Sequence, residues 1–184
     1  AILFIVLLTS SFVFAQNTYV PDDKFEQALI DLGYDTTLDD SVLTANISSV
    51  TSLDVYDKQI SDLTGIEAFT ALTTLAISNN QLTSINVTSN TALTILESYA
   101  NKLTSLDVTN NTALTELYVD GAELATGLDV SKNTALTKLY CGGNQLTSLD
   151  VSKNTALRYF QCYYNKITSL DVSKNTALIN LDCS

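Results

Sequence analysis

Tyrosines, carboxylates and a few lysines recur at regular intervals in the second half of this chain, and they are the side chains best suited to chemistry. A tyrosine offers a flat apolar ring with a polar tip, and the charged groups add ionic and hydrogen-bonding contacts, which suits binding. Catalysis has less to work with, because the chain has no histidine and shows no nucleophile motif or glycine-rich phosphate loop. We therefore expect a binding protein rather than an enzyme, with no cofactor and no metal.

Ten residues form the candidate binding set, and six of the nine tyrosines are among them. The set is Tyr99, Glu116, Tyr118, Asp120, Lys138, Tyr140, Tyr159, Gln161, Tyr163 and Tyr164. Gly142 and Gly143 would leave a notch between Tyr140 and the two tyrosines that end the set, and this notch is the expected centre of contact. The alternative is that the rings only stabilise a sheet, since aromatic residues favour strands.

The elements that hold these residues are copies of one repeat. Its first apolar position recurs in steps of 21 or 22 residues, at Val50, Leu72, Leu93, Leu114, Leu136, Leu157 and Leu178. The copies follow the pattern L-x-x-L-x-(L/I/V/C)-x-x-N-x-(L/I), with Lys58 and Ala122 as exceptions at the Asn position. Such a period indicates stacked structural repeats. The alternating leucines predict a strand too short to bury its apolar face except by stacking in parallel on its copies.

This pattern resembles the leucine-rich repeat family, over residues 50–184. The first complete copy, from Val50 to Ala71, is similar to the internalin type, and later copies with LDVSKNTAL resemble secreted Bacteroidetes proteins of the family. The resemblance implies an α/β repeat solenoid: a leucine-rich repeat horseshoe with short parallel strands on the concave side and turns or 3-10 helix on the convex side. A parallel β-helix is the rival architecture. The candidate binding residues would then lie on the concave face.

Three cysteines, Cys141, Cys162 and Cys183, occupy one inward strand position of consecutive copies. Disulfides are the first thought for a secreted protein. The odd number of cysteines and the apolar residues at the equivalent position of other copies favour buried free thiols instead. A zinc site is not expected, because no histidine is present to complete it.

The predicted convex side carries a column of aspartates and a column of lysines. The aspartates are Asp107, Asp129, Asp150 and Asp171, and the lysines are Lys132, Lys153 and Lys174. We expect each Asp to accept hydrogen bonds from backbone amides in a tight turn, and the lysines to offset the charge of the column. A calcium site is the alternative, and the interposed lysines argue against it.

The chain divides into three parts. Residues 1–15 are uncharged and mostly apolar, and predict a signal peptide, truncated at its start, that is cleaved before Gln16. Residues 16–49 predict a helical N-terminal cap, with a helix that begins near Pro21, buries Phe25 and Leu32 on one face and stops at Gly33. A short turn around Ser41–Leu43 would follow. Residues 50–184 hold six complete repeats and a seventh that is cut off.

Function is expected on the concave, tyrosine-rich face. The resemblance implies a non-catalytic binding or adhesion module that recognises a protein partner, at the cell surface or in secreted form. A glycan or polysaccharide ligand is the alternative, as is a spacer that projects a further domain. The net charge of −11 argues against nucleic acid as a partner, and we expect no membrane insertion of the mature chain.

Overall fold

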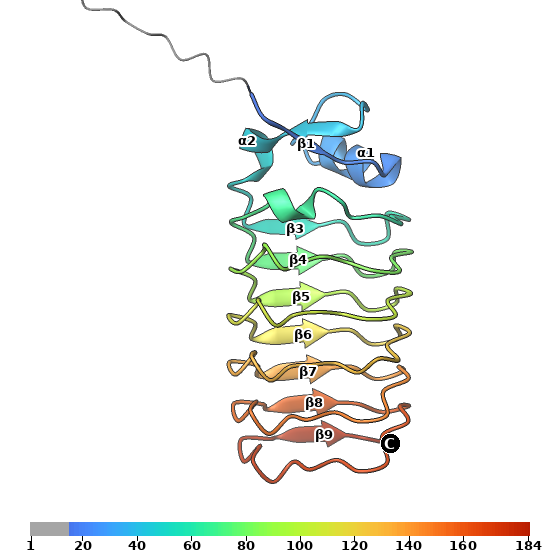
Figure 1. Ribbon diagram of the computed structural model, residues 1–184, viewed down its shortest axis with the longest axis vertical. Helices are drawn as coiled ribbons and strands as arrows, with labels where there is room; N and C mark the ends of the chain where they lie inside the picture. The colour runs from blue at the N-terminus through green and yellow to red at the C-terminus, as the bar shows by residue number, and fades with distance from the viewer. Residues whose placement is uncertain (1–14) are drawn as a thin grey trace, which may run out of the picture.

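Stacked coils form a column with a cap at its N-terminal end (Figure 1). The structure, a computed structural model, describes residues 15–184, so the predicted signal peptide lies outside the described residues except for Ala15. Seven parallel strands form one sheet in chain order. They are β3 (Ser52–Asp54), β4 (Thr74–Ala76), β5 (Ile95–Glu97), β6 (Glu116–Tyr118), β7 (Lys138–Tyr140), β8 (Tyr159–Gln161) and β9 (Asn180–Asp182). The predicted leucine-rich repeat solenoid is confirmed.

The strands pair in the register that the repeat predicts. Leu53 lies beside Leu75 in the sheet, Leu96 beside Leu117, and Phe160 beside Leu181. In β4 to β8 this central residue is fully buried. Burying one such side chain contributes roughly 1.5–3 kcal/mol, so the stack of like residues is the main source of stability.

Asparagines at the ends of the strands join consecutive coils. Asn80 donates from Nδ2 to the carbonyl of Val55 at 2.9 Å and to that of Ile77 at 2.8 Å, and its Oδ1 accepts from the amide of Ile60 at 2.9 Å. Asn101, Asn144 and Asn165 repeat this arrangement. Ala122 has no amide side chain and interrupts the series, as the sequence predicts.

The convex side consists of turns, with one 3-10 helix, η1 (Ile66–Ala68), in the first copy. The predicted role of the aspartates is confirmed, because Asp107 Oδ1 accepts from the Thr109 amide at 2.9 Å and Asp150 Oδ1 from the Ser152 amide at 2.8 Å. These hydrogen bonds lower the pKa of both carboxyl groups. The lysines act only at longer range: Lys153 further lowers the pKa of Asp150, and the ion pairs among residues 15–184 include none of the convex lysines.

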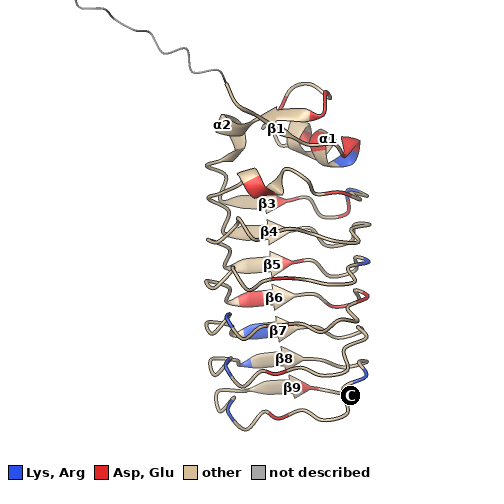
Figure 2. Ribbon diagram, in the orientation of Figure 1, with Lys and Arg blue, Asp and Glu red and all other residues tan. Residues whose placement is uncertain are grey.

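The cap contains two antiparallel strands, β1 (Asn17–Tyr19) and β2 (Ser41–Leu43), and two helices, α1 (Asp23–Asp31) and α2 (Thr44–Ile47). Acidic residues are prominent on it (Figure 2). The helix predicted from Pro21 is confirmed, with Asp22 as its N-cap and Gly33 at a φ of 80° after its end. No helix between residues 15 and 184 has the length and apolar character needed to cross a membrane.

Two details of the predicted cap are wrong. Leu32 is 45% exposed, because it is the C-cap of α1 and the chain leaves the helix there. The segment Ser41–Leu43 is strand β2 rather than a turn, because it pairs with β1. The spacing of apolar residues shows neither that β2 pairs with β1 nor that α1 ends before Leu32.

Candidate functional site

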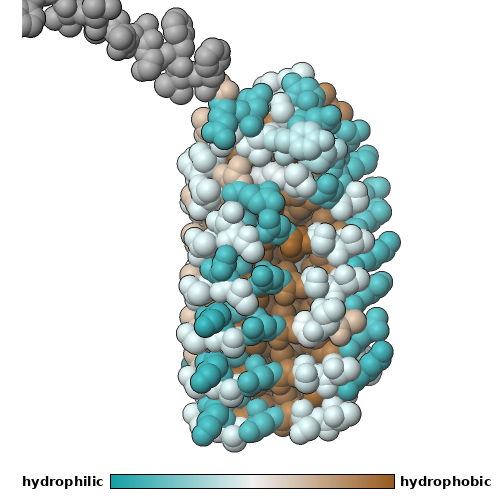
Figure 3. Space-filling model, in the orientation of Figure 1, coloured by the Kyte–Doolittle hydropathy of each residue, from teal (hydrophilic) through white to brown (hydrophobic). Residues whose placement is uncertain are grey.

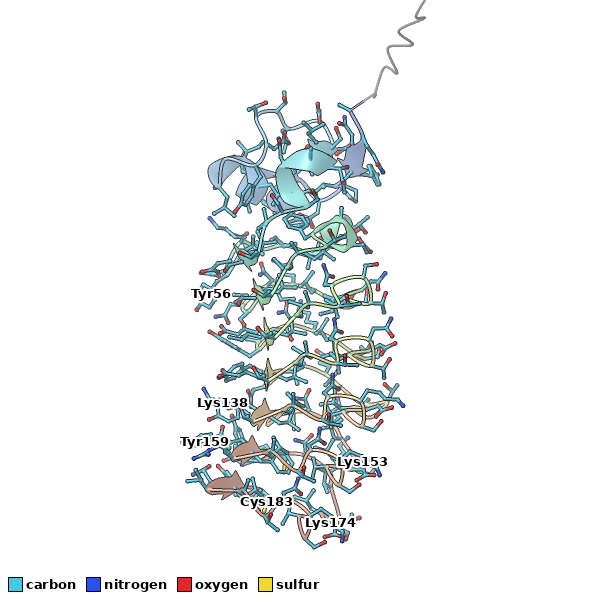
Figure 4. The ribbon with its side chains drawn as sticks, turned by 90° about the vertical axis from the view of Figure 1, so that its left-hand side faces the viewer. Tyr56, Lys138, Lys153, Tyr159, Lys174 and Cys183 are labelled. Atoms are coloured by element: carbon cyan, nitrogen blue, oxygen red, sulfur yellow. The ribbon has the colours of Figure 1, made fainter. Side chains whose placement is uncertain are left out.

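The ten candidate residues lie on the strand side of the column. Side chains alternate along a strand, so the buried Leu117 turns Glu116 and Tyr118 outward. Figure 4 shows Tyr56, Lys138 and Tyr159 on this side, opposite to Lys153 and Lys174. The column bends only slightly in that view, so the concave face is a shallow surface open to solvent.

One group of candidates forms a hydrogen-bonded network across β6 and β7. The hydroxyl of Tyr118 donates to Glu116 Oε2 at 2.6 Å, and Lys138 Nζ lies 3.1 Å from Glu116 Oε1. Burial and the hydrogen bond to Glu116 raise the pKa of Tyr118 to about 12. Burial alone would raise the pKa of Glu116, but Tyr118 and Lys138 more than offset this, and the net shift is downward. The lysine charge is therefore neutralised within the protein.

Tyrosine rings on this face meet in pairs. Tyr118 and Tyr140 are edge to face, with centroids 5.1 Å apart and planes at 88°, and Tyr163 and Tyr164 are similar at 5.5 Å and 86°. Edge-to-face contact is favourable between aromatic quadrupoles and contributes about 0.5–1.5 kcal/mol beyond burial. The pairs therefore hold their rings in place without a partner.

Sequence reasoning missed Tyr56. Its ring lies 6.4 Å from that of Tyr99, and its hydroxyl accepts from Asn79 Nδ2 at 2.6 Å. The signal was present, because Tyr56 holds in the first copy the same repeat position as Tyr99 and Tyr163 in later ones. Tyr56 therefore belongs to the concave face.

A hollow opens at the centre of the candidate set. Its volume is about 540 Å³, and it is lined by Tyr99, Ala100, Asp120, Gly121, Tyr140, Gly142, Gly143, Gln161 and Tyr163. Five of the ten candidates thus share one cavity. Tyr164 lies at its margin, since it packs on Tyr163, whereas Tyr159 pairs with Lys138 in the sheet, and neither Tyr159 nor Tyr164 lines the hollow.

The expectation of an open notch at Gly142 is wrong, because a tyrosine ring covers that glycine. A Cβ on Gly142 would lie 2.5 Å from the Tyr163 ring, so that ring already lies over the glycine. Tyr99 lies close to Ser78 of the previous coil, and Ser78 is fully buried although the repeat alignment places it outward. Two tyrosines therefore lean back over the preceding coil, and the hollow lies between them.

Asp120 is the charged residue of the hollow. Its Oδ1 accepts from the Gly142 amide at 2.9 Å, and the Tyr163 side chain lies nearby. Burial raises the pKa of Asp120, and the Gly142 amide and the Tyr163 side chain act in the opposite direction. Burial likewise raises the pKa of Tyr163, and the negative charge of Asp120 adds to the shift.

The floor of the hollow has a left-handed backbone. Ala100, Gly121 and Gly143 hold one repeat position, with φ of 53°, 61° and 63°. Tyr164 holds it in the next coil at 48°, and its side chain is 76% exposed. The left-handed conformation costs glycine the least conformational energy, which favours small residues at this position. Because three of these four sites hold Ala or Gly, no side chain fills the hollow there.

The cysteines are free thiols, two of them buried. Cys141 donates to the Gln161 carbonyl at 3.4 Å, and burial raises its pKa well above the ordinary value. Burial also raises the pKa of Cys162, to about 11. Cys183, on the last described strand β9, is exposed, which differs from the expected buried site. Within residues 15–184, no group of three or more His, Cys, Asp or Glu side chains is placed to hold a metal ion.

A second hollow, which sequence reasoning also missed, lies on the convex side. Its volume is about 520 Å³, and Leu106, Leu128 and Leu149 lie at its base beside the aspartate column. Figure 3 shows an apolar stripe between polar columns on this face. The three leucines are only 7%, 6% and 8% exposed, so they offer a partner little apolar surface. The tyrosine-lined hollow is the stronger candidate.

Comparisons with known proteins give one consistent likeness. No family model matches the chain. Internalin J of Listeria monocytogenes serotype 4b is 43% identical over 74 residues, which span 40% of this chain and 8% of that protein. The solved functional domain of InlJ from Listeria monocytogenes, which includes a cysteine ladder, is 36% identical with a TM-score of 0.76, and the match covers 95% of this chain and 44% of that one.

The crystal structure of internalin C2 from Listeria monocytogenes has the same fold, with a TM-score of 0.79 at 21% identity over 94% of this chain and 80% of that one. An internalin F structure from the same species matches 90% of this chain and 63% of that one at 24% identity, with a TM-score of 0.60. The chain therefore spans less than half of the solved internalin J domain, and a far smaller share of the whole protein, but most of the internalin C2 structure. Its fold and repeat pattern are those of an internalin-like leucine-rich repeat protein.

Proposed function

We propose that this chain binds a protein partner through its concave face, at the cell surface or in secreted form, and has no catalytic activity. One observation carries the proposal: the tyrosine-lined hollow lies on an open strand face that no other described element covers. Leucine-rich repeat domains of the internalin type are typically protein-binding. The ten candidate residues are the proposed contact surface.

The geometry favours a protein over a glycan. Aromatic rings bind sugars by presenting flat faces, yet Tyr118 and Tyr140 stand at 88° to each other and Tyr163 and Tyr164 at 86°. A mixed set of faces, edges and hydroxyls suits the irregular surface of a protein, and a tyrosine costs little conformational entropy to order. The Glu116–Lys138 ion pair beside the rings adds a fixed polar margin.

The domain organisation is part of the same proposal. Residues 1–15 would direct export, residues 16–49 would cap the column, and residues 50–184 would present the binding face. In this arrangement the partner is met outside the cell. The acidic composition, with a net charge of −11, suits a soluble extracellular surface and disfavours nucleic acid as a partner.

The test is a comparison of matched variants against candidate surface proteins. The wild-type chain, the concave variant Tyr140→Ala/Tyr163→Ala and the convex variant Lys153→Ala/Lys174→Ala are immobilised, and retained proteins are quantified. Interface tyrosines often contribute 2 kcal/mol or more, so the concave variant should lose at least about thirtyfold in affinity. The convex variant should bind as the wild type does.

Thermal unfolding of each variant separates lost binding from lost folding. A partner retained equally by the concave variant would refute the proposal, as would one lost only from the convex variant.

A further inference from the structure

The concave hollow holds a carboxylate without a cation. The ion pairs among residues 15–184 are Lys58 with Asp31 and Lys138 with Glu116. Asp120 lines the hollow and belongs to neither pair. The one lysine on the neighbouring strands, Lys138, is already 3.1 Å from Glu116 and donates to Tyr118 as well. The negative charge of Asp120 is therefore not neutralised by a basic side chain of the described protein.

Three aromatic rings line the same hollow, those of Tyr99, Tyr140 and Tyr163. The face of an aromatic ring has negative potential, and a cation within about 6 Å of its centre gains roughly 0.5–2 kcal/mol. Rings and carboxylate thus attract the same kind of group. An anionic ligand would meet repulsion from both, and a neutral one would leave the carboxylate desolvated without compensation.

The carboxylate is held in position before any ligand arrives. Gly142 donates its amide to Asp120 Oδ1 at 2.9 Å, and the nearby Tyr163 side chain acts to lower the pKa of the carboxyl group, as does that amide. The absence of a side chain on Gly142 lets the Tyr163 ring lie over it. A carboxylate has about four acceptor sites, so the Gly142 amide leaves room for further donors. Such a fixed acceptor loses little entropy when a cation binds.

We infer that this hollow is the subsite for an arginine side chain of the protein partner, with Asp120 accepting from its guanidinium and the tyrosines packing against its plane. The inference rests on the proposed function. Arginine fits better than lysine because its planar guanidinium combines several donors for the carboxylate with a flat face for the rings. A volume of about 540 Å³ accommodates that side chain together with part of its neighbours.

Small probes test the subsite without knowledge of the partner. Uniformly ¹⁵N-labelled protein is titrated with N-acetyl-arginine methylamide and, in parallel, with the neutral citrulline analogue of the same shape. Saturable shifts are expected at the amides of Gly121, Gly142 and Gly143. The arginine probe should bind about tenfold more tightly than citrulline, because a partly desolvated charge pair and cation–π contact contribute about 1.4 kcal/mol together.

Two isosteric variants, each of which removes one negative charge, test whether the preference for arginine over citrulline depends on Asp120. Asp120→Asn retains an acceptor for the Gly142 amide but loses the negative charge, so the preference for arginine over citrulline should disappear. Asp171→Asn removes a charge from the convex side and should leave the preference unchanged. Tyr140→Leu keeps the carboxylate and should weaken the arginine probe severalfold, which is informative even if Asp120→Asn folds poorly.

Equal affinity for arginine and citrulline would overturn the inference, and so would an unchanged preference in Asp120→Asn. Shifts at the same amides with a methyl glycoside but not with arginine would identify a sugar subsite instead. The proposed function is tested separately, by whether the variant Tyr140→Ala/Tyr163→Ala loses its binding to a protein partner. A partner lost there without any arginine preference would leave the proposed function intact and refute only this subsite.

Discussion

Asp22 connects the cap to the first repeat through hydrogen bonds, and its replacement should destabilise the folded protein. One carboxylate oxygen accepts from the amides of Lys24 and Phe25 at 2.9 and 3.0 Å, which caps helix α1. The other accepts from the amide and hydroxyl of Ser61, both at 2.8 Å, and from the amide of Asp62 at 2.9 Å. The residue itself is only 9% exposed. Five donors thus depend on one side chain.

The expected cost follows from these contacts. Loss of an Asp N-cap costs about 1 kcal/mol, and a hydrogen bond to a charged group contributes about 1.5–3 kcal/mol before water replaces part of it. Because Ser61 and Asp62 lie where water can enter, we take about 1 kcal/mol for each of their three bonds. Asp22→Ala should therefore lower the free energy of unfolding by about 4 kcal/mol. Asp22→Asn should cost about 3 kcal/mol, because it keeps the N-cap oxygen but replaces the oxygen that accepts the three bonds from Ser61 and Asp62.

The same contacts predict an acid dependence. Burial by itself raises the pKa of Asp22, but the hydrogen bonds from Ser61, Asp62 and Phe25 outweigh it, and the pKa is lower in the folded protein than its ordinary value of 3.8. A depressed pKa gives stability that is fully present above the unfolded pKa and is lost as the pH falls through the folded one. The difference in stability between wild type and Asp22→Asn should therefore shrink below about pH 4.

Urea unfolding at pH 7 and pH 3, with amide hydrogen exchange of residues 17–31, measures both effects. Asp23→Asn is the control, because Asp23 lies next in the chain, is exposed and loses the same charge. Its cost should stay below about 1 kcal/mol, as for an exposed charge in the first turn of a helix. If Asp22→Ala and Asp23→Asn were equally stable, or if the Asp22→Asn deficit were the same at both pH values, the account of Asp22 would be wrong.

Three further predictions concern the repeats. Ala100→Gly should raise the free energy of unfolding by about 0.5–1 kcal/mol, since Ala100 has a φ of 53° that glycine adopts without strain. Urea denaturation tests this, and a variant less stable than wild type would contradict it. Spectrophotometric titration should find a tyrosine with a pKa of about 12, that of Tyr118, and Glu116→Gln should lower it; an unchanged curve would exclude the network. Iodoacetamide at pH 8 should label Cys183 in the folded chain and the other two cysteines only after unfolding, as mass spectrometry of digests would show. Early labelling at all three would count against buried thiols.

The repeat was predictable because its evidence is redundant. Every copy places a leucine or phenylalanine at the same offset, and the structure puts Leu75, Leu96 and Phe160 in one buried stack. The cap was predicted less well, since it occurs once. Leu32 matches the apolar face of α1 by spacing and is nevertheless exposed, because the helix ends there and spacing contains no record of the end.

The sequence predicted the face on which the candidate residues lie, but not the contacts that they make with one another. Alternation along the strands placed Tyr99, Tyr118 and Tyr140 outward, and that orientation is confirmed. The leaning of Tyr163 over Gly142 could not be foreseen, because it depends on a rotamer and on space left by a residue one coil away. Tyr56 was missed for a simpler reason: its column was not extended back to the first copy.

The sequence by itself determined the stacking of this protein, because a 21-residue or 22-residue period permits one register in which all apolar positions meet and the asparagines reach the neighbouring coil. It also determined which strand residues face outward, with the buried Ser78 as an exception beyond the strand end. Only the tertiary structure decided which outward residues meet. The hollow around Asp120 and the network of Glu116, Tyr118 and Lys138 join side chains from different coils, and such contacts depend on packing across the sheet, which a linear period does not specify.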